Sequence, residues 1–256
     1  MKMTDNTILI TGGGSGIGRG LAEAFHHLGN QVIITGRTQK SLDETCAANP
    51  GMKSVTLDVS DPKSIQSFAA QVTKEFPSLN VLINNAGMMQ PENLLEKPND
   101  LSGVEKTVAT NLLGPIRLTA ALLPPLRKQP RATIMTVSSG LAFVPLAMTP
   151  TYCATKAAIH SYTQSLRYQL KGTKVEVIEL IPPYVQTTLM GDQQAEDPRA
   201  MPLKEFIDEV MSILKSQPDV KEVCVKKVYP LRFAAEGGQE KYEQFFQAFN
   251  DQMHAD

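Results

Sequence analysis

The chain has 256 residues, of which 42% are hydrophobic and 20% charged, and its formal net charge is −1. This composition is ordinary for a globular protein, and the near-neutral charge gives no electrostatic reason to expect nucleic acid or an anionic membrane as a partner. The three cysteines are scattered, which predicts reduced thiols in a cytoplasmic protein, and the four histidines lack zinc-ligand spacing, which predicts no metal site. The sequence shows no signal peptide and no apolar run of about 18 residues, so no membrane segment is predicted.

Short β-branched runs alternate with helical patterns from the N-terminus onward. A first strand is predicted at 7–11, and a helix at 16–29 follows it, with Gly29 as the C-terminal cap. Asp61 is predicted to cap a later helix, because aspartate at the cap followed by proline, here Pro62, is a favoured helix start. Further elements are predicted as a helix at 41–49 and strands at 32–35, 54–59, 81–84, 132–138 and 174–180.

Apolar strands separated by helices imply parallel pairing, with helices covering both faces of the sheet. No Pro/Gly/Ser-rich linker and no repeat divides the chain, so residues 1–256 are predicted to form a single α/β domain around a doubly wound parallel sheet. In such folds ligands bind beyond the carboxyl ends of the strands. The motifs described next fall at those ends.

A glycine-rich stretch, TGGGSGIG at 11–18, joins the first strand to the first helix. Glycines let a backbone turn sharply and approach a pyrophosphate, and the N–H groups at the start of a helix offer an anion site. The spacing is GxxxGxG, formed by Gly12, Gly16 and Gly18. Because a glycine-rich turn is also found as a tight connection without a ligand, this loop alone leaves both interpretations open.

Together with NNAG at 84–87 and YxxxK at 152–156, the glycine spacing resembles that of the short-chain dehydrogenase/reductase family, over about residues 5 to 190. The resemblance implies a Rossmann-type α/β/α subunit with six to seven strands. It also implies hydride transfer between a nicotinamide dinucleotide and a carbonyl or secondary alcohol, in a homodimer or homotetramer. Where the family usually reads PGxVxT, this chain reads IPPYVQTT with Pro183 in the place of glycine. This Pro-Pro resembles a bacterial branch named for D-alanyl–lipoteichoic acid operons.

The cofactor preference depends on the end of the second strand. Gly36 stands where an acid would contact the ribose hydroxyls of NAD, and the guanidinium of Arg37 is suited to a 2′-phosphate. NADP(H) is therefore favoured. NAD(H) stays open, because Arg37 is also consistent with a solvated arginine at a helix start and because Ser15 lacks the positive charge of some NADP-preferring members.

The other cofactor contacts are carried over from the family by resemblance. Asp58 matches the acid facing the adenine amino group, and Asn84 of NNAG is expected to be partly structural. The predicted cofactor-binding residues besides Arg37 are Gly12, Ser15, Gly16, Ile17, Gly18, Asp58, Val59, Asn85, Ala86, Gly87, Tyr152, Lys156, Pro182, Val185 and Thr187.

Four residues are predicted to perform the chemistry. Hydride addition to a carbonyl leaves negative charge on oxygen, so a proton donor is needed there, and a free phenol with a pKa near 10 is a weak donor at neutral pH. Tyr152 is predicted as the acid, and Lys156, one helical turn on, as the cation that lowers its pKa. By resemblance, Ser139, thirteen residues before the tyrosine, orients the substrate oxygen, and Asn111 holds a water through its backbone carbonyl.

The C-terminal part departs from the family pattern. Residues 187–206 stand where the family has its substrate lid, a seventh strand is expected at 222–228, and a helix at 240–249 carries an aromatic stripe more typical of a core or subunit contact than of a substrate site. The pocket walls are predicted to be Leu141, Phe143, Tyr184 and Met190. This apolar set favours a hydrophobic ketone or aldehyde.

Two alternative functions stay open on the sequence. One is a dinucleotide-binding regulator that has lost its chemistry, against which the intact Ser139, Tyr152 and Lys156 argue. The other is an NAD(H)-dependent alcohol dehydrogenase. A sugar epimerase or dehydratase is disfavoured, because those relatives are longer and have the glycine spacing TGxxGxxG.

Overall fold

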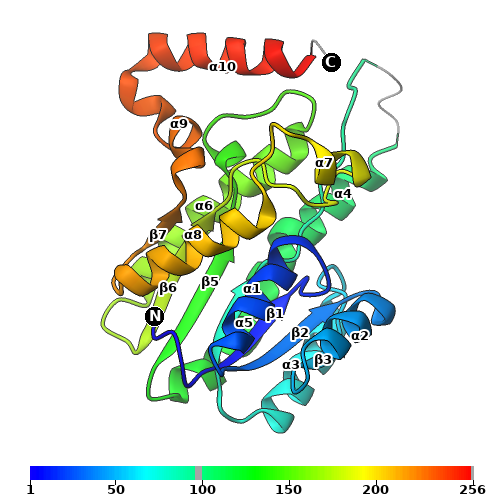
Figure 1. Cartoon of the computed structure of the whole chain (residues 1–256), viewed down its shortest axis with the longest axis vertical. Helices are drawn as coiled ribbons and strands as arrows, with labels where there is room; N and C mark the ends of the chain where they lie inside the picture. The colour runs from blue at the N-terminus through cyan, green and yellow to red at the C-terminus, as the bar shows by residue number, and fades with distance from the viewer. Residues whose placement is uncertain (96–99, 255–256) are drawn as a thin grey trace.

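Seven parallel strands form one sheet in the order β3-β2-β1-β4-β5-β6-β7 in this computed structural model, which describes residues 1–95 and 100–254 (Figure 1). The chain reverses its direction across the sheet between β1 and β4, and this switch point opens a crevice at the carboxyl ends of the two strands. The strands are β1 (Thr7–Thr11), β2 (Gln31–Gly36), β3 (Lys53–Thr56), β4 (Leu79–Asn84), β5 (Ala132–Val137), β6 (Val175–Ile181) and β7 (Glu222–Cys224). The predicted Rossmann-type doubly wound sheet is confirmed.

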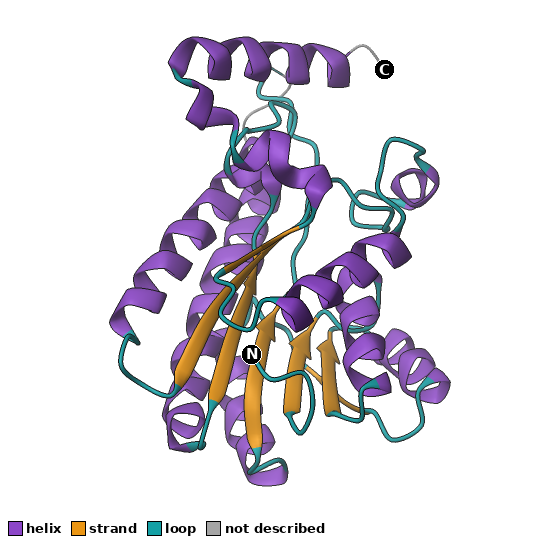
Figure 2. Ribbon diagram, turned by 60° about the vertical axis from the view of Figure 1, so that its left-hand side comes forward, coloured by secondary structure: helices purple, strands orange, loops and turns teal. Residues whose placement is uncertain are grey.

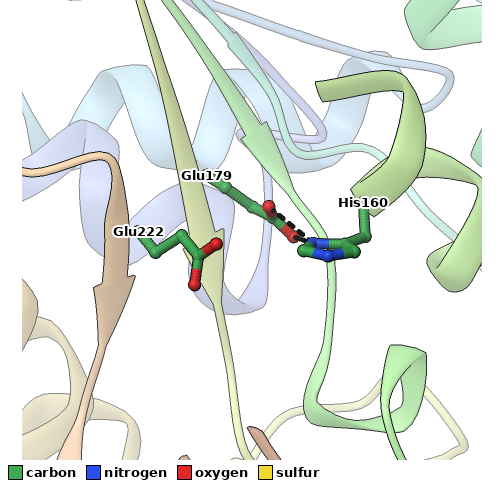
Figure 3. A group of neighbouring side chains, drawn as sticks. All are labelled: His160, Glu179 and Glu222. Carbon is green, nitrogen blue, oxygen red and sulfur yellow. Dashed lines mark hydrogen bonds and ion pairs between the residues drawn. The ribbon is translucent and has the colours of Figure 1, made fainter. Parts of the chain in front are cut away.

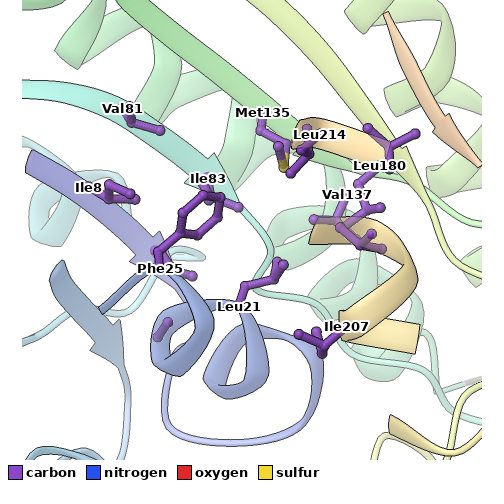
Figure 4. Packing of buried hydrophobic residues seen from close by; sticks show 14 of the residues in the cluster. Ile8, Leu21, Phe25, Val81, Ile83, Met135, Val137, Leu180, Ile207 and Leu214 are labelled. Atoms are coloured by element: carbon purple, nitrogen blue, oxygen red, sulfur yellow. The ribbon is translucent and has the colours of Figure 1, made fainter. Parts of the chain in front are cut away.

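Helices cover both faces of the sheet. On one face lie α1 (Gly16–His27), α2 (Gln39–Ala48) and α8 (Leu203–Ser216), and on the other lie α3 (Pro62–Glu75), α5 (Gly114–Lys128) and α6 (Pro150–Gln169). Alternate residues of β1 point to opposite faces, so Ile8 packs in the first cluster and Leu9 in the second. Figure 4 shows Phe25 of α1 and Ile207 of α8 packed in the first of these clusters.

The remaining helices gather at the carboxyl ends of the strands or beyond them. α10 runs across this end of the molecule, away from the sheet (Figure 2). These elements are α4 (Ser102–Val108), the π-helix η1 (Ala109–Leu113), η2 (Gly140–Ala142), α7 (Asp192–Glu196), η3 (Lys226–Val228), α9 (Tyr229–Arg232), η4 (Ala234–Gly237) and α10 (Gln239–His254). Within the described ranges no helix has both the length and the apolar character that crossing a bilayer requires.

Most predicted elements differ from the observed ones by a few residues at their ends, and three of the differences bear on the site. β3 ends at Thr56 instead of 59, because the Asp58 carboxylate accepts hydrogen bonds from the N–H and hydroxyl of Ser60 and turns the chain. β7 ends at Cys224 instead of 228, and the N–H of Lys226 donates to a glutamate of α8 instead of a neighbouring strand. α8 begins at Leu203, inside the segment expected as a lid.

The N-cap of α3 has the predicted geometry. The carboxylate of Asp61 accepts from the N–H groups of Lys63 (3.0 Å) and Ser64 (3.2 Å), and Pro62 occupies the first helical turn. Asp61→Ala is therefore expected to lower the free energy of unfolding by about 1 kcal/mol, measured by urea denaturation.

The control for this variant is Asp43→Ala on the exposed surface of α2, where the carboxylate accepts a hydrogen bond from the side chain of Gln39 and caps no helix. Its effect should stay within about 0.5 kcal/mol. If the two variants lose the same stability, the capping assignment is wrong.

Candidate active site

The glycine loop between β1 and α1 has the backbone conformation that requires glycine. Gly12 and Gly16 have φ values of +67° and +51°, in the left-handed region. A Cβ atom at Gly18 would lie 2.2 Å from the carbonyl oxygen of Gly12 and 2.4 Å from Nδ2 of Asn85. The loop is thus packed so closely on itself that its third glycine has no room for a side chain.

The start of α1 fits a phosphate group. Ser15 stands at the N-cap without a side-chain capping bond, and the first turn contains no acidic residue, so the helix N–H groups are not satisfied by a protein anion. Thr187 lies beside this point, since a Cβ on Gly16 would be 3.4 Å from its Cγ2. Ile17 is half-buried against the first apolar cluster. The residues present therefore fit a dinucleotide pyrophosphate.

Thr11, at the end of β1, connects the glycine loop to the NNAG segment. Its hydroxyl accepts from the N–H groups of Asn85 and Ala86, both at 3.0 Å. The side chain of Asn85 donates in return to the Thr11 carbonyl at 2.9 Å. Thr11 was not predicted from the sequence, although its position directly before the glycines is a signal. Asn84 is buried and donates to Thr119 of α5 at 3.0 Å, which gives it a structural contact.

A surface pocket of about 300 Å³ lies at the other end of the crevice. Its lining is formed by Arg37, Thr56, Leu57, Asp58 and Ser64, so the structure brings the predicted Arg37 and Asp58 together. Partial burial by itself raises the pKa of Asp58, but the two hydrogen bonds from Ser60, with Arg37 and Lys106 nearby, outweigh it and hold the pKa below its ordinary value. Val59, the next residue, is buried.

Tyr152 and Lys156 lie on one face of α6, and both are buried. The Lys156 ammonium donates to the Val137 carbonyl at the end of β5 (2.8 Å) and lies 5.5 Å from the centroid of the Tyr152 ring. Ser139 follows the same strand, and its hydroxyl accepts from the N–H of Leu141 at 3.1 Å. Three of the four predicted catalytic residues therefore converge at the end of β5.

Asn111 joins this group from the π-helix η1. Its side chain accepts from the Met88 N–H (2.9 Å) and donates to the Met88 carbonyl (2.8 Å), which fixes the segment after NNAG. A Cβ on Gly87 would lie 3.5 Å from Oδ1 of Asn111 and 3.7 Å from Nζ of Lys156, so all three residues are neighbours. π-helical turns are frequent at functional sites, and this one places the asparagine beside the lysine.

Burial dominates the electrostatics of the tyrosine and the lysine. Burial raises the pKa of Tyr152 above its ordinary value, and a hydrogen bond with Ser139 acts in the opposite direction. Burial lowers the pKa of Lys156 to about 8, and the negative charge of Glu179 acts against this. Lys156 is not among the groups that shift the pKa of Tyr152 here, so the lowering of that pKa by the lysine stays a prediction.

The predicted substrate-pocket residues separate into two groups. Leu141 packs against a third apolar cluster. The buried members of this cluster are Leu146, Tyr152 and Cys153, and the partly buried side chains at its edge are Met89, Leu141, Met148, Phe249 and Met253. Phe143 packs its ring against His160 (4.7 Å between centroids) and under the guanidinium of Arg232 (4.6 Å). Phe249, from the aromatic stripe of α10, thus contacts the tyrosine cluster.

The other two predicted pocket residues belong to the segment after β6. The Tyr184 hydroxyl donates to Asp197 at 3.1 Å, and the Met190 N–H donates to the side chain of Gln194 at 3.0 Å. Gln194 was not predicted from the sequence, since a glutamine in a polar stretch gives no signal. Its amide also donates to the Val185 carbonyl (2.8 Å) and the Thr187 hydroxyl (3.1 Å).

Two of the predicted cofactor residues in this segment anchor it to the body of the protein. The Pro182 carbonyl accepts from the N–H of Gly140 at 2.9 Å, directly after Ser139. Val185 is buried and forms an isolated parallel bridge with Met201. The Pro-Pro turn is therefore held against the end of β5, next to the predicted catalytic residue Ser139.

One group of described residues, His160, Glu179 and Glu222, places potential metal-ligating atoms within 4.8 Å of one another (Figure 3). Both oxygens of Glu179 lie within 3.0 Å of Nδ1 of His160, and Glu222 pairs with Arg232 at 2.8 Å. Because each carboxylate already has a partner, and one partner is a permanent cation, the group is a satisfied polar network rather than an open cation site.

Known proteins with similar sequences and structures were identified. The sequence pattern of the short chain dehydrogenase family matches residues 6–198. The chain is 40% identical to a Bacillus subtilis protein named uncharacterized oxidoreductase DltE, over 98% of this chain and 99% of the relative. A short chain dehydrogenase from Burkholderia cenocepacia in complex with NADP has a TM-score of 0.81 and 24% identity, covering 96% of this chain and 99% of that one. A short chain dehydrogenase/reductase from Burkholderia phymatum in complex with NAD has a TM-score of 0.79 and 21% identity, covering 92% and 95%.

Proposed function

The chain belongs to the short-chain dehydrogenase/reductase family of oxidoreductases, and we propose that it transfers hydride between NADP(H) and a carbonyl or secondary alcohol. The observation that carries this proposal is the convergence of Tyr152, Lys156, Ser139 and Asn111 at the strand ends, next to a glycine loop shaped for a pyrophosphate. The proposed enzyme is a single-domain cytoplasmic homodimer or homotetramer that acts on a small molecule.

The residues of the chain divide the proposed reaction among them. When bound, the nicotinamide supplies or accepts the hydride. In the reducing direction, the Ser139 hydroxyl orients the carbonyl oxygen of the substrate, and the Tyr152 phenol donates a proton to that oxygen. The Lys156 ammonium stabilises the phenolate that remains. The Asn111 side chain holds the backbone of Met88 in place. Burial of the tyrosine excludes water from the proton transfer.

The dinucleotide would be held along the crevice from Arg37 to Thr187. The glycine loop and the start of α1 would bind the pyrophosphate, and Asp58 with Val59 would bind the adenine. The similar structures from the two Burkholderia species contain NADP and NAD, which supports a nicotinamide dinucleotide in this chain. Arg37 favours NADP(H), because it is exposed at the end of β2 beside the adenosine-side pocket.

An apolar ketone or aldehyde is the proposed substrate class. Tyr152 belongs to the third apolar cluster, against which three methionines and a phenylalanine pack. Methionine side chains adapt to varied apolar shapes. These side chains favour an apolar substrate over a phosphorylated one.

The proposed function is tested by following absorbance loss of NADPH and NADH separately with a panel of apolar ketones and aldehydes. Turnover of at least one carbonyl with NADPH is expected. Binding of NADPH without oxidation by any member of a broad panel would favour the regulator hypothesis, and clear preference for NADH would overturn the role given to Arg37.

Arg37 is expected to determine the cofactor preference. A charge-assisted contact with a 2′-phosphate is worth about 1.5–3 kcal/mol, so Arg37→Gln should weaken NADPH binding by about 10- to 100-fold. NADH, which lacks the phosphate, should bind as before. Dissociation constants from the fluorescence of the bound nicotinamide measure both.

The matched control is Lys40→Gln, which removes another exposed cation three residues further along. It should leave both dissociation constants unchanged. If Arg37→Gln weakens the binding of NADPH and of NADH equally, the substitution has a general effect on the loop, and recognition of the 2′-phosphate by Arg37 is contradicted.

A further inference from the structure

A row of polar side chains crosses the sheet below the catalytic group. In-register pairing aligns Asn84 of β4 with Thr136 of β5, Thr136 with Glu179 of β6, and Glu179 with Glu222 of β7. Each member bonds to a residue of a helix: Asn84 to Thr119, Thr136 to Thr163, Glu179 to His160 and Glu222 to Arg232. The first two members are neutral, so the negative charge of the row begins at Glu179.

Glu179 is the one member of this row with a carboxylate in the interior. Its side chain is fully buried, and both carboxylate oxygens lie at 2.9–3.0 Å from Nδ1 of His160. Burying a carboxylate is costly unless hydrogen bonds and opposite charge compensate the loss of hydration. A neutral residue at this position would avoid the cost, so the charge calls for a reason beyond packing.

Besides His160 at 2.9 Å, the carboxylate has a second cationic side chain of α6 to act on, Lys156. Tyr152, Lys156 and His160 are spaced by four residues and share one face of α6. The ammonium of Lys156 is bonded to the carbonyl of Val137, which follows the register partner of Glu179 on the neighbouring strand. Glu179 thus stands on the strand next to the one whose carbonyl binds the buried ammonium.

We propose that Glu179 is a positioning residue for the active site: its buried carboxylate keeps Lys156 protonated beside Tyr152, and the His160 ring fixes the carboxylate. The electrostatics agree, because Glu179 is the charged group that opposes the effect of desolvation on the pKa of Lys156. This proposal depends on the proposed function only where it predicts an effect of Glu179 on catalysis. The coupling between the two side chains is a property of the folded protein alone.

The other groups around the pair do not replace this carboxylate. On α6 the titratable neighbours are Tyr152 and His160, and η1 contributes the uncharged Asn111. On the far side of Glu179, β7 supplies Cys224 and Glu222, and the charge of Glu222 is offset by Arg232 of α9. Glu222 is not among the charges that act on Lys156, which makes it the matched control.

The test is the titration of Lys156 by NMR of the lysine side-chain carbons, with Lys156→Arg to assign the signal. The wild-type midpoint is expected at the pKa of about 8 that burial gives this lysine. Glu179→Gln removes the charge and keeps the shape, and should lower this midpoint by about one pH unit. Glu222→Gln, which removes the other carboxylate of the network, should leave it unchanged.

A folded Glu179→Gln variant with the wild-type midpoint would overturn the proposal. If that variant does not fold, Glu179→Asp carries the test: it keeps the charge opposite His160, withdraws it by one methylene, and should lower the midpoint by a smaller amount. An unchanged midpoint in Glu179→Asp contradicts the proposal equally.

Catalysis gives the second measurement and separates the two proposals. Carbonyl reduction needs both a charged lysine and a protonated tyrosine, so the alkaline limb of kcat in Glu179→Gln should move to lower pH with the NMR midpoint. A lowered midpoint in a protein that reduces no carbonyl would leave the coupling in place and refute the proposed function. If the Lys156 midpoint falls but the alkaline limb of kcat stays at the wild-type pH, the effect of Glu179 on catalysis is refuted.

Discussion

Tyr152→Phe is expected to reduce kcat for carbonyl reduction by a factor of about 10³, within the range for loss of a general acid. The substitution removes only the phenolic oxygen and leaves the ring in its apolar cluster with Leu146 and Cys153. Because hydride addition without a proton donor leaves an alkoxide in a buried site, the reaction loses its main stabilisation. Initial rates with NADPH and the best ketone of the panel measure the effect.

Cofactor affinity separates this loss from a structural effect. The dissociation constant for NADPH should be nearly unchanged, since the proposed pyrophosphate and adenosine sites lie on the glycine loop and the β2 and β3 ends. Tyr162→Phe is the matched control: it makes the same substitution on the same helix, at a half-buried position packed in the second apolar cluster. It should retain wild-type turnover. Substantial activity in Tyr152→Phe would remove the tyrosine from the mechanism.

The candidate site was largely predictable because its motifs obey local rules. Gly12 and Gly16 need the left-handed region, and Gly18 has no space for a side chain, so the loop leaves a glycine pattern in the sequence. Tyr152 and Lys156 share a helix face, and a four-residue spacing encodes that. The strand and helix periodicities predicted the doubly wound sheet for the same reason.

The parts that sequence did not predict depend on contacts between distant segments. The ring of Phe143, a predicted pocket residue, packs under Arg232 from a helix near the C-terminus, a contact that the sequence does not indicate. β7 was predicted too long because Glu209, on α8, binds the backbone where the strand ends. No periodicity or motif carries such information.

Glu179 shows most clearly which contacts cannot be predicted from the sequence. In the sequence it is one of two acids in an otherwise apolar strand, and a period-two pattern would place it on the face opposite to Glu176 without naming its neighbours. Only the register between β5 and β6, together with the position of α6, brings it beside His160 and near Lys156. Its proposed role therefore follows from the fold and not from any motif.

Gly18→Ala is expected to have the largest effect on cofactor binding. The added Cβ would stand 2.2 Å from a backbone oxygen of Gly12 and 2.4 Å from the Asn85 side chain, distances that real Cβ atoms do not show. The loop or α1 must therefore move. We expect the free energy of unfolding to fall by about 1–3 kcal/mol and NADPH affinity to fall by at least about tenfold, or 1.4 kcal/mol.

Gly172→Ala is the control that makes the binding result specific. Gly172 has a φ of +82°, and a Cβ added there would have no heavy atom within 4 Å, so alanine strains only the backbone, at a cost of about 1–2 kcal/mol. Both variants should lose stability in urea denaturation, but only Gly18→Ala should lose NADPH affinity, because only its loop forms the proposed pyrophosphate site. If Gly18→Ala binds NADPH as the wild type does, the close packing of the glycine loop is not what shapes the site.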